Sequence, residues 1–156
     1  MTLKKYLPIA ISLYLITGFL FTWYNFLSHF NLGHLLAAPF PATLFIIISG
    51  YFLYAGIVGL FSNNSHTIFK LQSVALMMQV LQFSFFGFVY ANHAGPYIGV
   101  GLYFQPTTMF DIDVSIYKYL FSNGYSANAA PYFFLNLFPL LIWGLYQLVI
   151  KKNEDN

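Results

Sequence analysis

The sequence predicts an all-α integral membrane protein, a bundle of four transmembrane helices with a structured outer loop, in a single membrane domain that covers residues 1–156. Two observations support this prediction. The chain is 59% hydrophobic and only 6% charged, whereas soluble domains carry about 25% charged residues. Its few charges also leave long uncharged stretches, and each exceeds the roughly 20 apolar residues that cross a hydrocarbon core of about 30 Å.

The first predicted span covers about residues 6–27 and follows Lys4 and Lys5. The apolar part of a secretory signal is shorter, about 7–15 residues, so we expect this segment to be retained as a helix. A second span is predicted at about residues 44–61, because turn formers and polar residues interrupt the hydrophobic run before it. A polar turn at residues 62–66 follows it.

A third span is predicted at about residues 68–92, and a fourth at about residues 132–150. The connection between them is too long for an unstructured loop in a compact domain. Residues 108–122 fit a short interfacial helix, because their polar groups recur at helical spacing on one stripe. We expect this helix to form an outer cap on the bundle.

The lysines predict the orientation, because basic residues near span ends stay in the cytoplasm. With the N-terminus in the cytoplasm, Lys118 alone lies outside, and the cytoplasmic lysines are Lys4, Lys5, Lys70, Lys151 and Lys152. The reverse topology inverts this distribution. We therefore expect a plasma (inner) membrane protein with both termini in the cytoplasm.

Composition excludes several chemistries. The net charge of +2 is too small and too scattered for a nucleic-acid partner. Without cysteine there is no thiolate catalysis or thiolate ligation. The outer-loop charges Asp111, Asp113 and Lys118 are the groups outside the membrane that are suited to acid–base work, but carboxylates two residues apart on a helix point in different directions. We therefore predict no catalytic residue and expect the protein not to be an enzyme.

Three histidines are candidate cofactor-binding residues. His29 and His34 follow the first span and His93 ends the third, so the predicted topology places all three near the outer face. Neutral imidazole ligates haem iron and other metals. Histidines at the interface are more often belt residues, so no cofactor is predicted and metal binding stays open. A redox subunit that holds a b-type haem or a quinone is the alternative.

Polar residues inside the predicted spans form a second candidate site. Amides in lipid need partners, and hydrogen bonds between helices contribute about 0.6–2 kcal/mol each. We interpret these residues as holding the bundle together, and a path for a small solute is the alternative. We call this set the polar seam: Thr17, Gln72, Gln79, Gln82, Asn136 and Gln147.

Ala55 and Gly59 form a small-xxx-small pair that allows close helix approach, with the neighbour either inside the bundle or in another subunit. Together these features predict a non-catalytic accessory or oligomeric membrane subunit. Its outer cap is expected to bind a protein partner or membrane lipid. The two alternatives are the haem- or quinone-binding redox subunit and a small-solute transporter.

Overall fold

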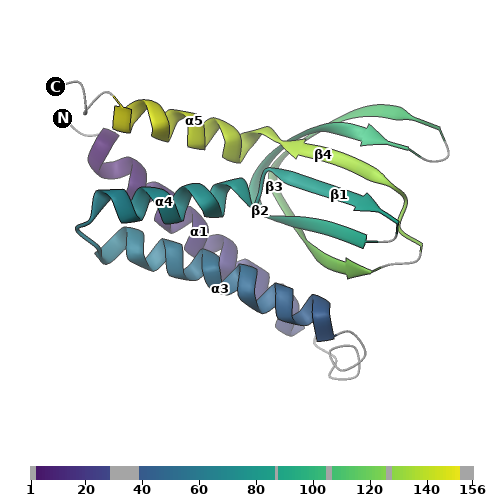
Figure 1. The fold of residues 1–156 in the computed structure, drawn as a ribbon, viewed down its shortest axis with the longest axis horizontal. Helices are drawn as coiled ribbons and strands as arrows, with labels where there is room; N and C mark the ends of the chain where they lie inside the picture. Colours follow the sequence, from purple (N-terminus) through teal and green to yellow (C-terminus); the bar gives the residue numbers. More distant parts are fainter. Residues whose placement is uncertain (1–2, 29–38, 87, 105–106, 126–127, 152–156) are drawn as a thin grey trace.

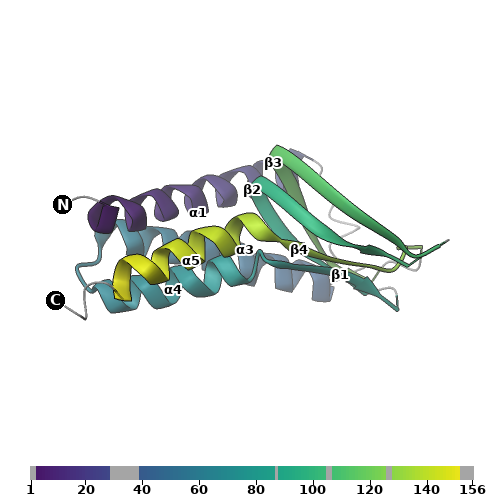
Figure 2. The same ribbon diagram turned by 90° about the horizontal axis from the view of Figure 1, so that it is seen from above.

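The computed structural model describes residues 3–28, 39–86, 88–104, 107–125 and 128–151. In chain order its elements are α1 (Leu3–Ser28), α3 (Pro39–Phe61), α4 (Ser65–Met77), β1 (Leu81–Phe85), β2 (Phe88–Tyr103), β3 (Met109–Tyr125), β4 (Tyr132–Asn136) and α5 (Leu137–Lys151). The prediction of an all-α bundle of four spans is therefore wrong. The helices gather at one end of the molecule and an antiparallel sheet forms the other end (Figures 1 and 2).

Two helices, α1 and α3, contain stretches long and apolar enough to cross a membrane, at Tyr6–Ser28 and Thr43–Phe61. At 26 and 23 residues, they extend about 39 and 35 Å. Only 28% of the first stretch and 39% of the second is buried. Both helices therefore leave much of their apolar surface exposed, which is consistent with membrane association.

The third predicted span ends as a helix at Met77. Beyond it, polar and aromatic residues alternate strictly, with Gln82 and Ser84 on one face and Phe83 and Phe85 on the other. A period of two is the pattern of a strand with two different faces, and aromatic residues favour strands. Continuous hydrophobicity over residues 68–92 concealed this change of period.

The fourth predicted span and the predicted interfacial helix are also corrected. Residues 132–136 form β4, and α5 begins only at Leu137. Residues 108–122 fall largely in β3, which begins at Met109. β-branched Ile112, Val114 and Ile116 alternate with polar residues there, which suits a strand better than a helix.

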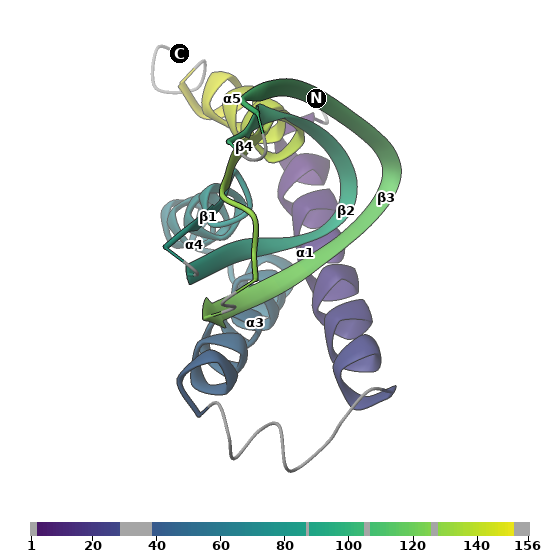
Figure 3. The ribbon, with the colours of Figure 1, turned by 90° about the vertical axis from the view of Figure 1, so that its right-hand side faces the viewer.

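The sheet has the order β1-β4-β2-β3, and an additional β1–β2 pairing closes β1, β2 and β4 into a ring. The first half of β2 pairs with β1 and its second half pairs with β4. β3 pairs with β2 along its length. The bend in β2 lies at Gly95, which has φ +141°, beside a shift in register. Figure 3 shows β2 and β3 curling together around the inside of the sheet.

The helices pack around one apolar core. Its buried members come from α1, α3, α4 and α5: Ile11, Leu15, Ile48, Phe52, Ala55, Ala75, Leu76 and Tyr146. Small residues bring α1 and α3 close together, because a Cβ at Gly56 would lie 2.6 Å from Ile16 Cγ1 and one at Gly59 would overlap Ser12 and Gln72. The close neighbours of Gly59 are therefore inside this chain.

Candidate functional site

On β1 and β3, the polar side chains are more buried than the apolar side chains with which they alternate. On β1, Gln82 and Ser84 are buried whereas Phe85 is exposed. On β3, Asp111 and Asp113 are half-buried, and the alternating apolar residues are exposed, by 64% at Phe110, 58% at Ile112, 70% at Val114 and 93% at Ile116. Sheets in soluble proteins show the reverse pattern, and strands that face lipid show this one.

The outer-loop charges lie on one strand face. Because residues two apart on a strand share a face, Asp111 and Asp113 point the same way, contrary to the helical prediction. Lys118 forms an ion pair with Asp113, and its Nζ lies 4.4 Å from the centre of the Tyr97 ring. The charged groups of β3 therefore pack against the inner face.

Asn136 joins the sheet to the helices. Its Nδ2 lies 2.9 Å from His93 Nδ1, and its Oδ1 accepts from the backbone N–H groups of Ile98 at 3.3 Å and Phe138 at 3.2 Å. The bond to Phe138 caps the start of α5, as asparagine does at many helix N-termini. The Asn136 backbone N–H donates to Val80 O at 2.7 Å. Asn136 thus holds the end of β4, the bend in β2 and the start of α5 together.

His93 is fully buried on β2 rather than at the end of a helix. The Asn136 amide nitrogen can only donate, so His93 Nδ1 accepts, and its Nε2–H donates to Gly95 O at 3.0 Å. Burial lowers the pKa of His93 to about 4, against the raising effect of its interactions with the backbone carbonyls of Gly95 and Pro96. The imidazole is neutral at pH 7, and each ring nitrogen already has a partner.

The other candidate cofactor residues cannot be placed beside His93. His29 and His34 lie outside the described residues. Within the part of the chain that the structure describes, no group of three or more metal-ligating side chains comes together. To ligate a metal or haem, His93 would have to give up its bond to Asn136 or to Gly95.

The Tyr97 side chain fills the inside of the ring of strands β1, β2 and β4. Its hydroxyl donates to Gln82 Oε1 at 3.0 Å, and its ring lies 5.3 Å from that of His93. Burial, followed by the nearby Asp113, raises the pKa of Tyr97, so the phenol stays protonated. Gly99 makes room for it, because a Cβ there would overlap the Tyr97 ring.

The residues of the polar seam differ in how deeply they are buried. Gln72, Gln79, Gln82 and Asn136 are buried, whereas Thr17 is exposed and Gln147 is half-buried. The seam continues from the ring into the helices. There the Tyr14 hydroxyl donates to Gln79 Oε1 at 2.7 Å, and Gln72 Nε2 donates to Ser12 Oγ at 2.8 Å and Pro8 O at 2.9 Å. The Gln72 bonds link α1 to α4, and the Tyr14 bond links α1 to the turn that follows α4.

Two polar atoms on β1 have no hydrogen-bond partner among the described residues. They are Gln82 Nε2 and Ser84 Oγ, both buried. Each such group costs about 1–3 kcal/mol when left unpaired. The inner face therefore has hydrogen-bonding capacity that the described side chains do not use.

Sequence reasoning missed Tyr97 and the bonds that Ser12 and Tyr14 make to the seam. A signal for the ring was present in the alternation of residues 109–116 and in the glycines at every second position, Gly99 and Gly101, after Tyr97. Comparisons with protein-family models, with curated proteins and with solved structures found no match to this chain.

Proposed function

We propose that the protein is a non-catalytic membrane subunit in which α1 and α3 cross the bilayer and the strand ring forms an outer cap that contacts lipid. The observation that carries the proposal is the exposed apolar row of β3, the outer row, formed by Phe110, Ile112, Val114 and Ile116. Burying each such side chain is worth about 1.5–3 kcal/mol. Contact with acyl chains supplies this stabilisation for the whole row.

The chemistry inside the ring supports a non-catalytic role. His93 is hydrogen-bonded to Asn136, Tyr97 is hydrogen-bonded to Gln82, and Lys118 is paired with Asp113. Such a network fixes the ring to the helices. A closed ring also satisfies its backbone groups internally, which non-helical structure beside lipid requires. β3 is the outermost strand of the sheet and is not part of this ring. If β3 lies at the membrane interface, the backbone groups on its outer edge can form hydrogen bonds with water.

The arrangement of the helices supports the proposed orientation. The start of α1, the end of α5 and the turn between α3 and α4 lie at the same end of the molecule, opposite the sheet (Figures 1 and 2). Lys70 is in the first half of α4 near that end, and positions 4, 5 and 151 are lysines too. By the positive-inside rule this end is cytoplasmic, so the cap lies on the outer side of the plasma membrane.

Site-directed nitroxide labelling tests the lipid contact. The chain contains no cysteine, so single-cysteine variants carry one label each. Labels at Ile112→Cys and Ile116→Cys sample the outer row, and Asn63→Cys, in the exposed turn before α4, samples water. Collision with oxygen and with a water-soluble nickel chelate is then measured in vesicles of phosphatidylethanolamine and phosphatidylglycerol.

We expect the labels at positions 112 and 116 to collide readily with oxygen and at least fivefold less with the nickel chelate than the label at position 63. Equal access to the chelate would place the outer row in water and overturn the proposal. Low access to both reagents would show a protein interface there, and the subunit would then bind a protein partner, not lipid.

A small-solute transporter is the second candidate function, and the unpaired Gln82 Nε2 and Ser84 Oγ favour it. A polar solute that accepts hydrogen bonds would satisfy both groups inside the ring. Uptake of polar solutes into vesicles is the test. It supports this function if the Gln79→Leu and Gln82→Leu double variant folds but loses uptake, and unchanged uptake excludes the seam as a path.

A further inference from the structure

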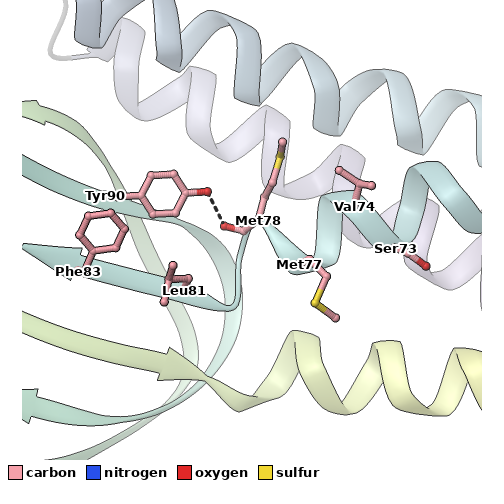
Figure 4. A pocket seen from close by; sticks show the side chains of 7 residues that line it. All are labelled: Ser73, Val74, Met77, Met78, Leu81, Phe83 and Tyr90. Atoms are coloured by element: carbon pink, nitrogen blue, oxygen red, sulfur yellow. Dashed lines mark hydrogen bonds between the residues drawn. The ribbon is translucent and has the colours of Figure 1, made fainter.

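A hollow of about 540 Å³ opens where α4 passes into β1 (Figure 4). We call it the junction pocket. Its volume falls within the roughly 300–1,000 Å³ of small-molecule sites. The walls come from the last turns of α4, from β1 and from β2, and the side chains that shape it are Val74, Met77, Met78, Leu81, Phe83 and Tyr90.

The junction pocket offers an almost wholly apolar surface. The rings of Phe83 and Tyr90 stack at 5.6 Å and form one wall. The Tyr90 hydroxyl donates to Met78 O at 3.0 Å, which ties β2 to the end of α4 and fixes the shape of that wall. Ser73 also lines the hollow, but its hydroxyl oxygen is buried. Two methionines leave part of the lining adaptable to a flexible occupant.

The depth of the junction pocket in the membrane indicates which kind of molecule occupies it. With 13 residues, α4 extends about 20 Å, less than the hydrocarbon core of about 30 Å. In the proposed orientation α4 starts at the cytoplasmic end, so Met77 and the pocket lie within the hydrocarbon. Val74, which lines the pocket, is exposed, so the pocket opens onto the surface of α4.

We infer that the junction pocket binds one acyl chain of a membrane phospholipid, an inference that rests on the proposed membrane function. An acyl chain matches the apolar walls, the depth and the flexible methionines. The acyl chain fills the hollow between the end of α4 and the start of β1.

Photocrosslinking tests this inference. The full-length protein is reconstituted in vesicles of phosphatidylethanolamine and phosphatidylglycerol that contain a trace of phospholipid with a diazirine in mid-chain. Crosslinked sites are then mapped by mass spectrometry. We expect labelling at Met77 and Met78 to exceed that at Leu141 and Leu148, which lie exposed on α5, by at least fivefold.

Filling the pocket provides the matched comparison. Val74→Trp, with Val74→Phe as a milder form, should lower labelling at Met77 and Met78 at least fivefold. The same change on the open face, Leu141→Trp, should leave the labelling of both methionines unchanged. Each variant is first shown to elute as the wild type on size exclusion, and the phenylalanine form is used if the tryptophan form does not.

Three results would overturn the inference. Equal labelling at Met77 and Leu141 would show ordinary lipid contact without a pocket ligand. Loss of the Met77 label on adding excess isoprenoid quinone would make a quinone the occupant. Absence of label at both sites would show that no bilayer surrounds the helices, and this result also defeats the proposed function, whereas the first two do not.

Discussion

The bend in β2 makes a strong prediction about Gly95. Its φ of +141° lies in a region that side-chain-bearing residues rarely adopt. A Cβ at this position would also lie 2.6 Å from Cε2 of Tyr14 on α1. The Tyr14 ring cannot swing away freely, because its hydroxyl donates to Gln79 Oε1. Gly95→Ala should therefore strain the bend and push the sheet away from α1.

The expected cost is the sum of two effects. Backbone strain of this kind costs about 1–3 kcal/mol, and adding one carbon to a packed site costs about 1–3 kcal/mol. Some relaxation of the ring lowers the sum, so we take about 3 kcal/mol for the loss in free energy of unfolding. For a chain of this size, that corresponds to a fall of about 6–12 °C in Tm.

Thermal denaturation in detergent micelles, followed as the fraction that stays monodisperse, measures the change. Gly144→Ala on α5 is the matched control, because nothing lies within 4 Å of its added Cβ. Alanine is favoured over glycine within helices, so the control should be neutral or more stable. Combining Gly95→Ala with Tyr14→Leu should cost less than the sum of the single changes. If Gly95→Ala matches the control in Tm, the reasoning about the bend is refuted.

Three further predictions follow from the buried network. Asn136→Leu removes the cap of α5, which contributes about 1 kcal/mol, and leaves His93 Nδ1 unpaired at about 1–3 kcal/mol. Tm should therefore fall by about 4–16 °C, and an unchanged Tm would contradict the joint role of this residue. Gly59→Ala displaces the hydrogen-bonded Ser12 and Gln72 side chains and should lower Tm. Gly50→Ala is the control and should not lower Tm, because the added Cβ lies in open space. Equal effects of the two changes on Tm would show that the helices do not meet at Gly59. Burial lowers the pKa of His93 from 6.5 to about 4, so, as the pH falls, His93 is protonated in the unfolded chain before it is protonated in the folded chain. The stability that the neutral imidazole contributes is therefore complete above about pH 6.5 and is lost as the pH falls toward 4. A His93→Gln variant that keeps the full wild-type slope between pH 7 and 5 would assign that slope to other groups.

Parts of the site were predictable because local pattern is enough to place them. Helical spacing predicts that Gln72 and Gln79 share one face, and both are buried, although Gln79 lies in the turn just after α4. Gln82 was grouped with them for the same reason, yet it lies on β1 and bonds Tyr97. For Gln82, the spacing therefore predicts the burial of the side chain correctly but assigns it to a helix instead of a strand. A residue next to a change of period fits both patterns until the partner strand is known.

The sequence by itself predicts apolar helices at about residues 6–27 and 44–61, and the structure has them at Tyr6–Ser28 and Thr43–Phe61, because length and composition are local properties. Only the tertiary structure decided the rest. A run of apolar residues is compatible with a buried helix and with a strand, and the choice at residues 81–136 depends on ladder partners far away in the chain, such as Gly99 opposite Asn136. Those partners bury polar side chains such as Gln82 and Asn136 and leave the apolar side chains of β3 exposed, an arrangement that hydrophobicity alone does not specify.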